Sequence, residues 1–505
     1  MDSMKLTGCI LIAVIVRWAV SLFPYSGHDK KPMYGDFEAQ RHWMEITYHL
    51  PAKEWYHNTS ENNLQYWGLD YPPLTAYHSY LMGAIAHRIN PLFVPLNASE
   101  YHHQIRIADS FHETHKIFMR YTVLIVDILI YLPAIIMYHF AFDKTGNIDS
   151  IDRCMNIVIS MLYPGLVLVD HGHFQYNCVS LGLALWAIIL IGQQWNLMAS
   201  VFFCLALNYK QMELYHALPF FSYLLGNCFK QPTTNKALKS FNLLAFSVIV
   251  TFVICWFPFL KDCDISQPLQ VIHRLFPLKR GIFEDKVSNV WCSLTVLPRP
   301  FKKIKDLPVS VMSAVSLITT CLCVLPSSLH LFRKPTFRNF KLSLVNVALV
   351  FYLFSYQVHE KSILLVALPV CLLLPEQPLM CMWLLLISTF SMYPLLMRDL
   401  LSLPCLAMQV LFIILVFLRY GSKLWNIASP SYFDKLYIED FFVPSVSVAF
   451  LLCLLCQFKT PPTLWPDLWP VLISLYSCGH FLMFCFYFNC LQYIYDERDD
   501  TKKRN

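Results

Sequence analysis

The chain has 505 residues, of which 56% are hydrophobic and 14% are charged, and its formal net charge is +6. Soluble domains carry roughly 25% charged residues, so this composition excludes an ordinary soluble protein. Apolar runs of about 18–20 residues recur along the whole chain, and each can cross a hydrocarbon core of roughly 30 Å. The sequence therefore predicts an all-α polytopic membrane protein. The small positive excess fits contact with the lipid bilayer and its anionic headgroups better than binding of nucleic acid.

Hydropathy predicts about fourteen transmembrane spans. The predicted spans are residues 6–24, 117–140, 153–170, 178–194, 197–208, 211–226, 241–260, 308–332, 341–357, 361–375, 379–396, 404–419, 440–457 and 468–493. The first apolar run could be a cleaved signal peptide, but it contains Arg17 and no small-residue cleavage site follows, which favours a retained anchor. We expect a catalytic transmembrane module over 1–260 that includes the polar loop 25–116, a second long loop over 261–305, and a C-terminal transmembrane module over 306–505.

The distribution of Lys and Arg predicts which loops face the cytosol, because short loops rich in these residues stay on that side. Such loops carry Lys230, Lys236 and Lys239, and Arg333, Lys334, Arg338 and Lys341. With fourteen spans, both loops share a side with the two termini, so the loops 25–116 and 261–305 lie in the lumen. Sequons at Asn58 and Asn97 fall in the first of these loops, on the side where glycans are added. The terminal KKRN resembles a dilysine retrieval signal of the endoplasmic reticulum membrane, with an ordinary basic tail as the alternative.

The two luminal loops have features beyond those of linkers. The first is rich in Trp and Tyr and has amphipathic stretches over 36–49 and 73–89, which we expect to lie at the membrane interface as short helices. In the second loop, Cys263 and Cys292 could pair in an oxidising compartment, although spacing alone does not establish connectivity.

Carboxylates follow the first span and recur further along the same loop. In the motif GDFEAQRHW, Asp36 and Glu38 suit general-base work on a sugar hydroxyl, while capping of a helix N-terminus is the structural alternative. In the motif YWGLDYPP, Trp67 could stack on a pyranose ring and Asp70 could accept from sugar hydroxyls. An interfacial loop capped by Asp70 explains the second motif equally well.

The motif DHGHFQYN places His173 and Gln175 between two predicted spans. Two His residues at this spacing are a weak metal signal without further ligands, so we expect these side chains to line a polar cavity and expect no metal. Arg17 and Asp127 fall inside predicted spans, where they could pair or shape a cavity.

Cationic residues cluster at the predicted luminal ends of spans and in the second luminal loop. They are Lys210, Arg280, Lys286, His359 and Lys361, with Glu360 beside the last two. Each one alone is usually a flanking residue whose charge reaches the headgroups. However, charges at membrane depth are costly and mark functional sites, and together these cations could hold a phosphate.

The sequence contains no Walker-type or Rossmann-type glycine-rich loop, and it has only 14 glycines. This argues against an ATP-driven pump and against the soluble type of nucleotide-sugar enzyme. A substrate carried by a lipid is therefore favoured.

Six strings resemble the eukaryotic dolichyl-phosphate-glucose-dependent glucosyltransferases of the endoplasmic reticulum. They are GDFEAQRHW, YWGLDYPPLTAYHS, DHGHFQYN, NYKQMELYHALP, RLFPLKRGIFEDKV and FSYQVHEKSILL. The resemblance covers nearly the whole chain and is weakest beyond residue 400. It implies the GT-C fold, a transmembrane bundle with long luminal loops and an active site at the luminal membrane edge. Two members of this family add the first and the second glucose to a lipid-linked oligosaccharide, and NNLQYWGLDYPPLTAYHS resembles the first type.

The resemblance also implies roles for individual residues. Asp36 would be the general base that takes the proton from the 3-hydroxyl of a terminal mannose on Man9GlcNAc2-PP-dolichol. Inversion at the anomeric carbon of the β-linked donor, dolichyl-phosphate-glucose, would give an α-1,3 linkage. Asp70 would be a second essential carboxylate, and His359, Lys361 and Arg280 would bind the donor phosphate. No cofactor is expected, because fixed cations can carry the charge of the leaving phosphate.

Three alternatives stay open from the sequence. The chain could add the second glucose, it could be a transporter or lipid flippase, or it could be an inactive scaffold subunit. We see no internal repeat, and the charges lie at span ends, which disfavours a transporter. The intact carboxylates disfavour a scaffold.

Overall fold

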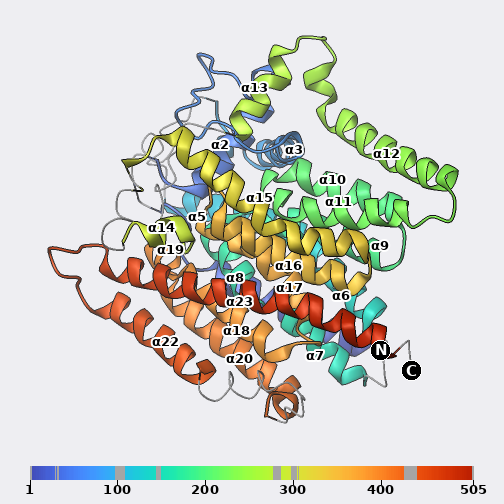
Figure 1. Ribbon diagram of the computed structural model, residues 1–505. Coiled ribbons are helices and arrows are strands. Elements are labelled where there is room, and N and C mark those ends of the chain that lie inside the picture. The colour runs from blue at the N-terminus through green and yellow to red at the C-terminus, as the bar shows by residue number, and fades with distance from the viewer. Residues whose placement is uncertain are drawn as a thin grey trace.

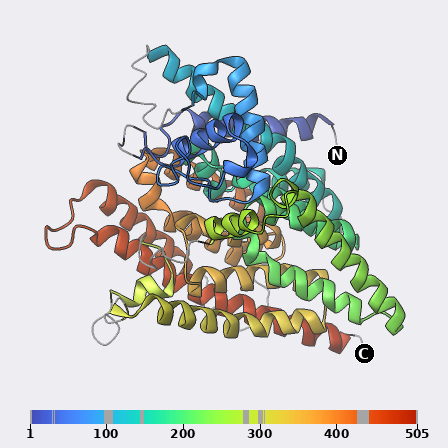
Figure 2. The same cartoon turned by 90° about the horizontal axis from the view of Figure 1, so that it is seen from above.

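The structure, a computed structural model, describes residues 3–28, 30, 33–96, 109–143, 149–276, 286–296, 304, 306–425 and 441–502. Across these residues the regular secondary structure is helical, with no strand, which confirms the predicted all-α class. The long helices lie alongside one another in a bundle, and the start of the first helix and the end of the last lie toward the same end of it (Figures 1 and 2).

The helices follow one another along the chain, and the two predicted luminal loops contain helices of their own. The first half contains α1 (Ser3–Ser21), α2 (Asp36–His49), η1 (Ala52–Glu54), α3 (Pro73–Ile89), η2 (Pro91–Phe93), α5 (Asp109–Val126), η3 (Asp127–Tyr131), α6 (Leu132–Phe142), α7 (Ser150–Met161), α8 (Pro164–Val167), η4 (Leu168–Phe174), α9 (Asn177–Gly192), α10 (Asn196–Tyr209), η5 (Gln211–Glu213), α11 (Leu214–Phe229) and α12 (Thr234–Leu260). The second half contains α13 (Ser266–Leu275), α14 (Val290–Leu294), α15 (Val309–Arg333), α16 (Phe337–Phe354), η7 (Glu360–Ser362), α17 (Ile363–Leu373), α18 (Pro378–Ser391), α19 (Tyr393–Arg398), α20 (Ser402–Trp425), α22 (Val443–Phe458) and α23 (Leu468–Lys502).

Seven helices of the described residues are long and apolar enough to cross a membrane. They are Ser3–Ser21, Glu113–Phe142, Thr234–Leu260, Val309–Arg333, Phe337–Phe354, Ser402–Ser422 and Leu468–Ile494. A pair bent by 44°, Ser150–Met161 with Pro164–Phe174, is an eighth candidate, and α9, α10, α18 and α22 are shorter apolar helices. The multi-pass prediction is confirmed, whereas the predicted count of fourteen is not. The difference arises because several apolar helices are shorter than the roughly 20 residues that a straight span needs.

The two amphipathic stretches predicted in the first polar loop form α2 and α3 with the predicted bounds. Two acidic residues occupy the first turn of α2, where they favour the helix dipole, and α3 begins at Pro73, whose fixed φ suits a first helical position. The two helices pack closely at Gly83, where a Cβ would lie 2.5 Å from the carbonyl oxygen of Met44. Because residue 83 has no side chain, the backbones of α2 and α3 can approach closely at this point.

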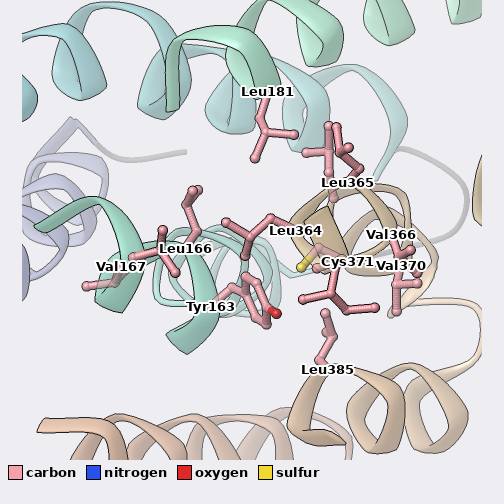
Figure 3. Close-up of a cluster of buried hydrophobic side chains, with 14 of the residues drawn as sticks. Tyr163, Leu166, Val167, Leu181, Leu364, Leu365, Val366, Val370, Cys371 and Leu385 are labelled. Atoms are coloured by element: carbon pink, nitrogen blue, oxygen red, sulfur yellow. The ribbon is translucent and has the colours of Figure 1, made fainter. Parts of the chain in front are cut away.

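The main apolar core surrounds α17, in which every residue is buried. Leu181 of α9, Leu385 of α18, and Tyr163 and Leu166 beside and on α8 gather around the side chains of this helix (Figure 3). A helix that is apolar on all sides belongs at the centre of a bundle. Since η7 leads directly into α17, the core anchors the segment that carries Lys361.

The helix α12 lies at the edge of the bundle and carries large exposed apolar side chains (Figure 1). They include Phe241, Phe246, Ile249, Ile254 and Phe257. In a protein with so many span-length helices, such side chains face lipid rather than water.

A buried ion pair joins the first helix to the centre of the bundle. The Nε atom of Arg17 donates to the Oδ2 atom of Asp127 at 2.5 Å, and both side chains are buried. The Nε2 atom of His171 lies 2.8 Å from the same oxygen. Of the two alternatives for these in-span charges, pairing is confirmed. Asp127 and His171 both lie in π-helical turns, which often occur at functional sites.

The second predicted luminal loop packs on the first through α13. Gln270 donates to the Tyr56 carbonyl at 2.9 Å, and Arg274 donates to the Gly68 carbonyl at 2.8 Å. No disulfide joins Cys263 to Cys292, so the pairing considered from sequence is not formed. The two cysteines lie on different packing units, since Cys263 precedes α13 whereas Cys292 lies on α14, which packs against α16 and α23.

Candidate active site

Several segments meet at one end of the bundle and bring polar side chains together. They contribute Asp36 at the start of α2, His173 and Gln175 at the end of η4, Lys210 after α10, Lys361 in η7 and Asp399 after α19. We call these six residues the polar site. Because each residue stands at a helix end, the polar site lies at the edge of the bundle rather than in its apolar core.

Asp36 is the centre of the polar site. Two donors converge on its Oδ2 atom, Lys361 Nζ at 2.5 Å and Gln175 Nε2 at 2.5 Å, and His173 Nε2 lies 3.1 Å from the same oxygen. The Asp36 side chain is still 25% exposed, whereas Lys361 and His173 are 8% and 3% exposed. The arrangement therefore holds one carboxylate rigidly while leaving it open to a ligand.

The backbone that leads into α2 is strained. Tyr34 and Gly35 have φ values of +61° and +85°, and a Cβ at residue 35 would lie 2.6 Å from Ser26 Oγ. Glycine is therefore required where the chain passes this close to Ser26. The same Oγ atom accepts the Asp36 N–H at 3.2 Å, so the tight approach fixes the first residue of α2.

A second strained residue aims two side chains at Asp36. Phe174 has a φ of +90°, a conformation that is rare for a bulky residue and that occurs at functional sites. It ends the π-helical turn η4, so that His173 and Gln175, on either side of it, reach the same oxygen. Arg120 of α5 stabilises this turn by donating to the Gly172 carbonyl at 2.8 Å.

The charges around Asp36 keep its carboxylate ionised. Burial disfavours the charged form, but the ammonium of Lys361, together with the contact from His173, outweighs burial and holds the pKa of Asp36 well below its usual range. At neutral pH the polar site therefore contains a carboxylate that can accept hydrogen bonds and a proton.

Lys210 is a cation of the polar site whose hydrogen-bond partners are neutral. Its ammonium donates to the amide oxygens of Gln175 at 3.3 Å and Asn177 at 2.5 Å, and it lies 5.3 Å from the ring centroid of Tyr71. No carboxylate of the described residues pairs with it. A cation held only by neutral groups can gain an anionic ligand without first losing an ion pair.

Asp399 holds the far side of the His173 ring. Its Oδ2 atom lies 2.5 Å from His173 Nδ1, while the opposite ring nitrogen faces Asp36. The sequence analysis missed Asp399, which follows a predicted span next to an ordinary flanking Arg398. No local motif marks it, and only its contact with His173 identifies it.

Comparison with known proteins identifies the family. The chain matches the ALG6, ALG8 glycosyltransferase family over residues 13–487. The chain belongs to this family. A relative from Gallus gallus named dolichyl pyrophosphate Man9GlcNAc2 alpha-1,3-glucosyltransferase is 46% identical, and the match covers 99% of this chain and 98% of that protein. A relative of the same name from Rattus norvegicus is 48% identical, with 96% of each chain covered. A probable enzyme of that name from Drosophila melanogaster is 46% identical over 97% of this chain and 98% of its own.

In this glycosyltransferase, Glu38 has a different role from Asp36. Its two carboxylate oxygens accept from Arg41 at 2.7 and 2.8 Å, and one of them also accepts from the Tyr66 hydroxyl at 2.9 Å. The Glu38 side chain is completely buried. It fastens α2 to the loop that carries the YWGLDYPP motif, so for Glu38 the geometry favours the structural alternative.

Trp67 and Asp70 belong to the loop between η1 and α3, which contacts the segments around Asp36 and Lys210. Trp67 donates from Nε1 to the Met33 carbonyl, and its own carbonyl accepts from Trp43 at 2.8 Å. The carbonyl of Asp70 accepts from Gln211 at 3.0 Å, and the next residue along the chain places its ring against Lys210. These contacts position the loop, and the direct contacts to the Asp36 carboxylate come from elsewhere.

The remaining predicted cations divide into two groups. His359 lies beside the polar site, where its Nδ1 atom accepts the Lys361 N–H at 3.3 Å, and Glu360 lies 3.6 Å from Arg398. Lys286 instead pairs with Asp467, and both of these side chains are exposed. Arg280 and the sequon at Asn97 lie outside the described residues. Among the residues that are described, no group of three or more His, Cys, Asp or Glu side chains could hold a metal ion.

Proposed function

We propose that this glycosyltransferase moves glucose from dolichyl-phosphate-glucose to Man9GlcNAc2-PP-dolichol in an α-1,3 linkage and thereby adds the first glucose of the N-glycan precursor. One observation carries the proposal: the partly exposed carboxylate of Asp36 contacts Lys361 at the bundle edge, and Lys210 lies next to it across the side chain of Gln175. The names of the relatives support the acceptor and the linkage. The motif NNLQYWGLDYPPLTAYHS supports the first step over the second.

The reaction needs a base on one side of the sugar and a cationic site on the other. The 3-hydroxyl oxygen of the terminal mannose attacks the anomeric carbon of the β-linked donor, and its proton passes to Asp36. The carbon–oxygen bond to phosphate breaks on the opposite face, dolichyl phosphate leaves, and inversion gives the α linkage. A positioned carboxylate contributes about 10²–10⁴-fold to such a transfer.

Fixed cations support the departure of the phosphate. Lys210 has only amide oxygens and an aromatic ring as partners, and Lys361 already bridges Asp36 and His173. Two ammonium groups beside the base can stabilise the charge that grows on the leaving phosphate in a site with little water. We assign Lys210 and Lys361, with His359, to the donor phosphate.

An apolar groove next to Lys210 suits an isoprenoid chain. It has a volume of about 430 Å³ and is lined by Pro72, Leu207, Asn208, Gln211, Leu214, Phe252, Val253, Trp256, Leu260, Pro268, Ile272, Leu275 and Phe276. Gln211 belongs to this lining and follows Lys210 directly in the chain. A lipid-linked phosphate that reached Lys210 would therefore have an apolar path for its tail between α10, α12 and α13.

We place the enzyme in the endoplasmic reticulum membrane with the polar site in the lumen and both termini in the cytosol. The Lys- and Arg-rich loops and the exposed sequon at Asn58 support this orientation. The packing of α13 on the first polar loop agrees with both loops lying on one side.

The direct test is glucose transfer by the purified full-length protein in detergent, with EDTA present. The substrates are short-chain dolichyl-phosphate-glucose and a Man9GlcNAc2 lipid acceptor, and the product linkage is read by mass spectrometry and linkage-specific glucosidase digestion. We expect α-1,3 transfer by the wild type and a loss of about 10²–10⁴-fold in Asp36→Asn. Glu61→Gln is the control, because it removes an exposed carboxylate from the same polar loop that we do not assign to the chemistry.

The acceptor decides between the alternatives. Transfer only to an acceptor that already carries one glucose would assign the second step instead. No transfer to either acceptor from a folded protein would overturn the enzymatic proposal and favour a transporter or a scaffold.

A further inference from the structure

The three groups at the centre of the polar site form a triangle of close contacts. Asp36 Oδ2, Lys361 Nζ and His173 Nε2 are separated by 2.5 Å, 3.0 Å and 3.1 Å. The general base therefore touches a second group, His173, that can also take up a proton. In the proposed transfer only Asp36 accepts the proton.

Asp399 decides which nitrogen of His173 carries the hydrogen. The carboxylate oxygen of Asp399 accepts at 2.5 Å from His173 Nδ1, which must therefore be the protonated nitrogen. In the neutral ring Nε2 then has a free lone pair. Lys361 donates to that lone pair as well as to Asp36, so the lone pair points into the triangle.

We propose that Asp399 and His173 form a proton relay behind Asp36. The inference rests on the proposed glucosyl transfer. When the acceptor hydroxyl loses its proton to Asp36, the O–H bond so formed breaks again as the proton crosses to His173 Nε2. The resulting imidazolium lies between two carboxylates, Asp36 and Asp399, and Asp36 is restored as an anion. The proton then leaves His173 for solvent as the products depart.

The relay solves a specific difficulty of the polar site. A carboxylate held strongly ionised by a neighbouring ammonium is a weak proton acceptor, whereas an imidazole between two carboxylates is a strong one. Asp399 is buried, at 6% exposure, and cannot touch the sugar itself without first releasing His173. We therefore assign it as a positioning residue that fixes the ring and its tautomer.

The charged and titratable groups that face His173 come from several elements. Asp36 comes from α2, Lys361 and His359 from η7 and its lead-in, Asp399 from the end of α19, and Arg120 of α5 lies against the neighbouring Gly172 carbonyl. The two carboxylates favour the imidazolium and the cations oppose it. Removing Asp399 must therefore make the imidazolium harder to form.

The test compares Asp399→Asn, Asp399→Glu and the neighbouring Arg398→Gln as full-length proteins in the transfer assay, over pH 5–9. For Asp399→Asn we expect kcat to fall about a hundredfold with little change in the donor KM. The acidic limb of the kcat profile should also move to lower pH, because the neutral ring persists further into acid when one carboxylate is gone. Asp399→Glu should recover most of the rate, and Arg398→Gln, whose side chain is exposed, should match the wild type.

Each outcome decides between the relay and a simpler role. If Asp399→Asn lowers kcat but leaves the acidic limb of the pH profile in place, Asp399 has only a packing role and the relay is overturned. An unchanged kcat in Asp399→Asn would also overturn the relay. If Asp399→Asn does not fold, His173→Gln is measured in its place, because glutamine can contact Asp36 but cannot take up a proton. For His173→Gln we expect the acidic limb of the kcat profile to disappear. A folded wild type that transfers no glucose would overturn the proposed function, and the relay with it, whereas normal transfer by the variants would overturn the relay alone.

Discussion

Lys361 lies 2.5 Å from Asp36 although the two residues are 325 positions apart in the chain. The contact joins η7, at the start of the most deeply buried helix, to the first residue of α2 on the polar loop. It thereby ties the catalytic candidate to the rigid core and sets the charge state of the Asp36 carboxylate.

The ionisation of Asp36 should contribute to stability in a defined pH window. Burial opposes the charge, but Lys361 and His173 hold the pKa of Asp36 well below the 3.8 of a free carboxyl. A carboxyl with a lowered folded-state pKa stabilises the protein above its unfolded pKa, and this contribution is lost as pH falls through the folded value. We expect Asp36→Asn to lower the thermal midpoint in detergent by a similar amount from pH 8 to pH 5. The difference should shrink only below about pH 4. A difference that disappears between pH 7 and pH 5 would contradict the lowered pKa.

Lys210 should control donor binding and give it an alkaline limit. Burial, together with the charge of Lys361, lowers the pKa of Lys210 to about 8. The donor KM should therefore rise above pH 8, where the ammonium loses its proton, while at pH 7 Lys210→Met should raise KM by about tenfold. Lys210→Arg should keep the low KM up to pH 9.5, because a guanidinium stays protonated. Lys286→Met, which removes an exposed lysine paired with Asp467, is the control and should leave the donor KM unchanged.

The buried pair of Arg17 and Asp127 should be a large stability determinant. Removing one partner leaves a charge without its counter-ion inside the bundle, which costs about 3–5 kcal/mol of unfolding free energy. We expect Arg17→Met to lower the thermal midpoint and the yield of monodisperse protein. The double variant Arg17→Met with Asp127→Leu should recover part of the loss, since apolar replacement of both partners is often tolerated. Trp18→Leu, on the exposed side of the same helix, is the control, and an equal loss there would refute the assignment.

The apolar groove beside α12 should matter in proportion to the length of the donor lipid. Leu207 lines the groove, and Leu207→Trp should narrow it. We expect a raised KM for a long-chain donor and little change for a short-chain donor, measured side by side in the same detergent. Phe246→Trp, at an exposed α12 position outside the groove lining, should affect neither substrate. Equal effects of Leu207→Trp on both donors would show that the lipid tail lies elsewhere.

Asn58 should carry an N-glycan if the first polar loop is luminal. Its side chain is exposed, and its Oδ1 atom accepts from the Leu64 N–H at 3.2 Å. Endoglycosidase treatment of protein from microsomes should therefore shift its gel mobility, and Asn58→Gln should remove that part of the shift. Asn63→Gln, which changes an exposed asparagine of the same loop outside any sequon, is the matched control. A shift that survives Asn58→Gln unchanged would place the occupied site elsewhere.

Much of the helical architecture could be predicted because its causes are local. The amphipathic stretches over 36–49 and 73–89 predicted α2 and α3 with the observed bounds. The apolar run over 308–332 predicted both ends of α15 to within one residue. The count of fourteen spans is not confirmed, because hydropathy cannot separate a short buried helix from a membrane crossing. The bent pair around residue 162 illustrates this, since one apolar run became two helices at an angle of 44°.

The candidate site was predicted in part. Asp36, His173, Gln175, Lys210 and Lys361 were selected from motifs, and the structure brings them together. Glu38 was indistinguishable from Asp36 by residue type. Only the side-chain directions separate them, because Arg41, one helical turn along α2, occupies both oxygens of Glu38.

The sequence by itself determined that this protein is a multi-pass helical membrane protein with carboxylates and cations at helix ends, because composition and short-range periodicity decide those properties. Only the tertiary structure decided that Lys361 and His173 share one oxygen of Asp36, and that Asp399 holds the opposite side of the histidine ring. Those contacts depend on how helices hundreds of residues apart pack, on a strained turn at Phe174, and on side-chain directions at the helix ends. Local residue patterns contain none of that long-range geometry, which is why Asp399 could be recognised only after the bundle was assembled.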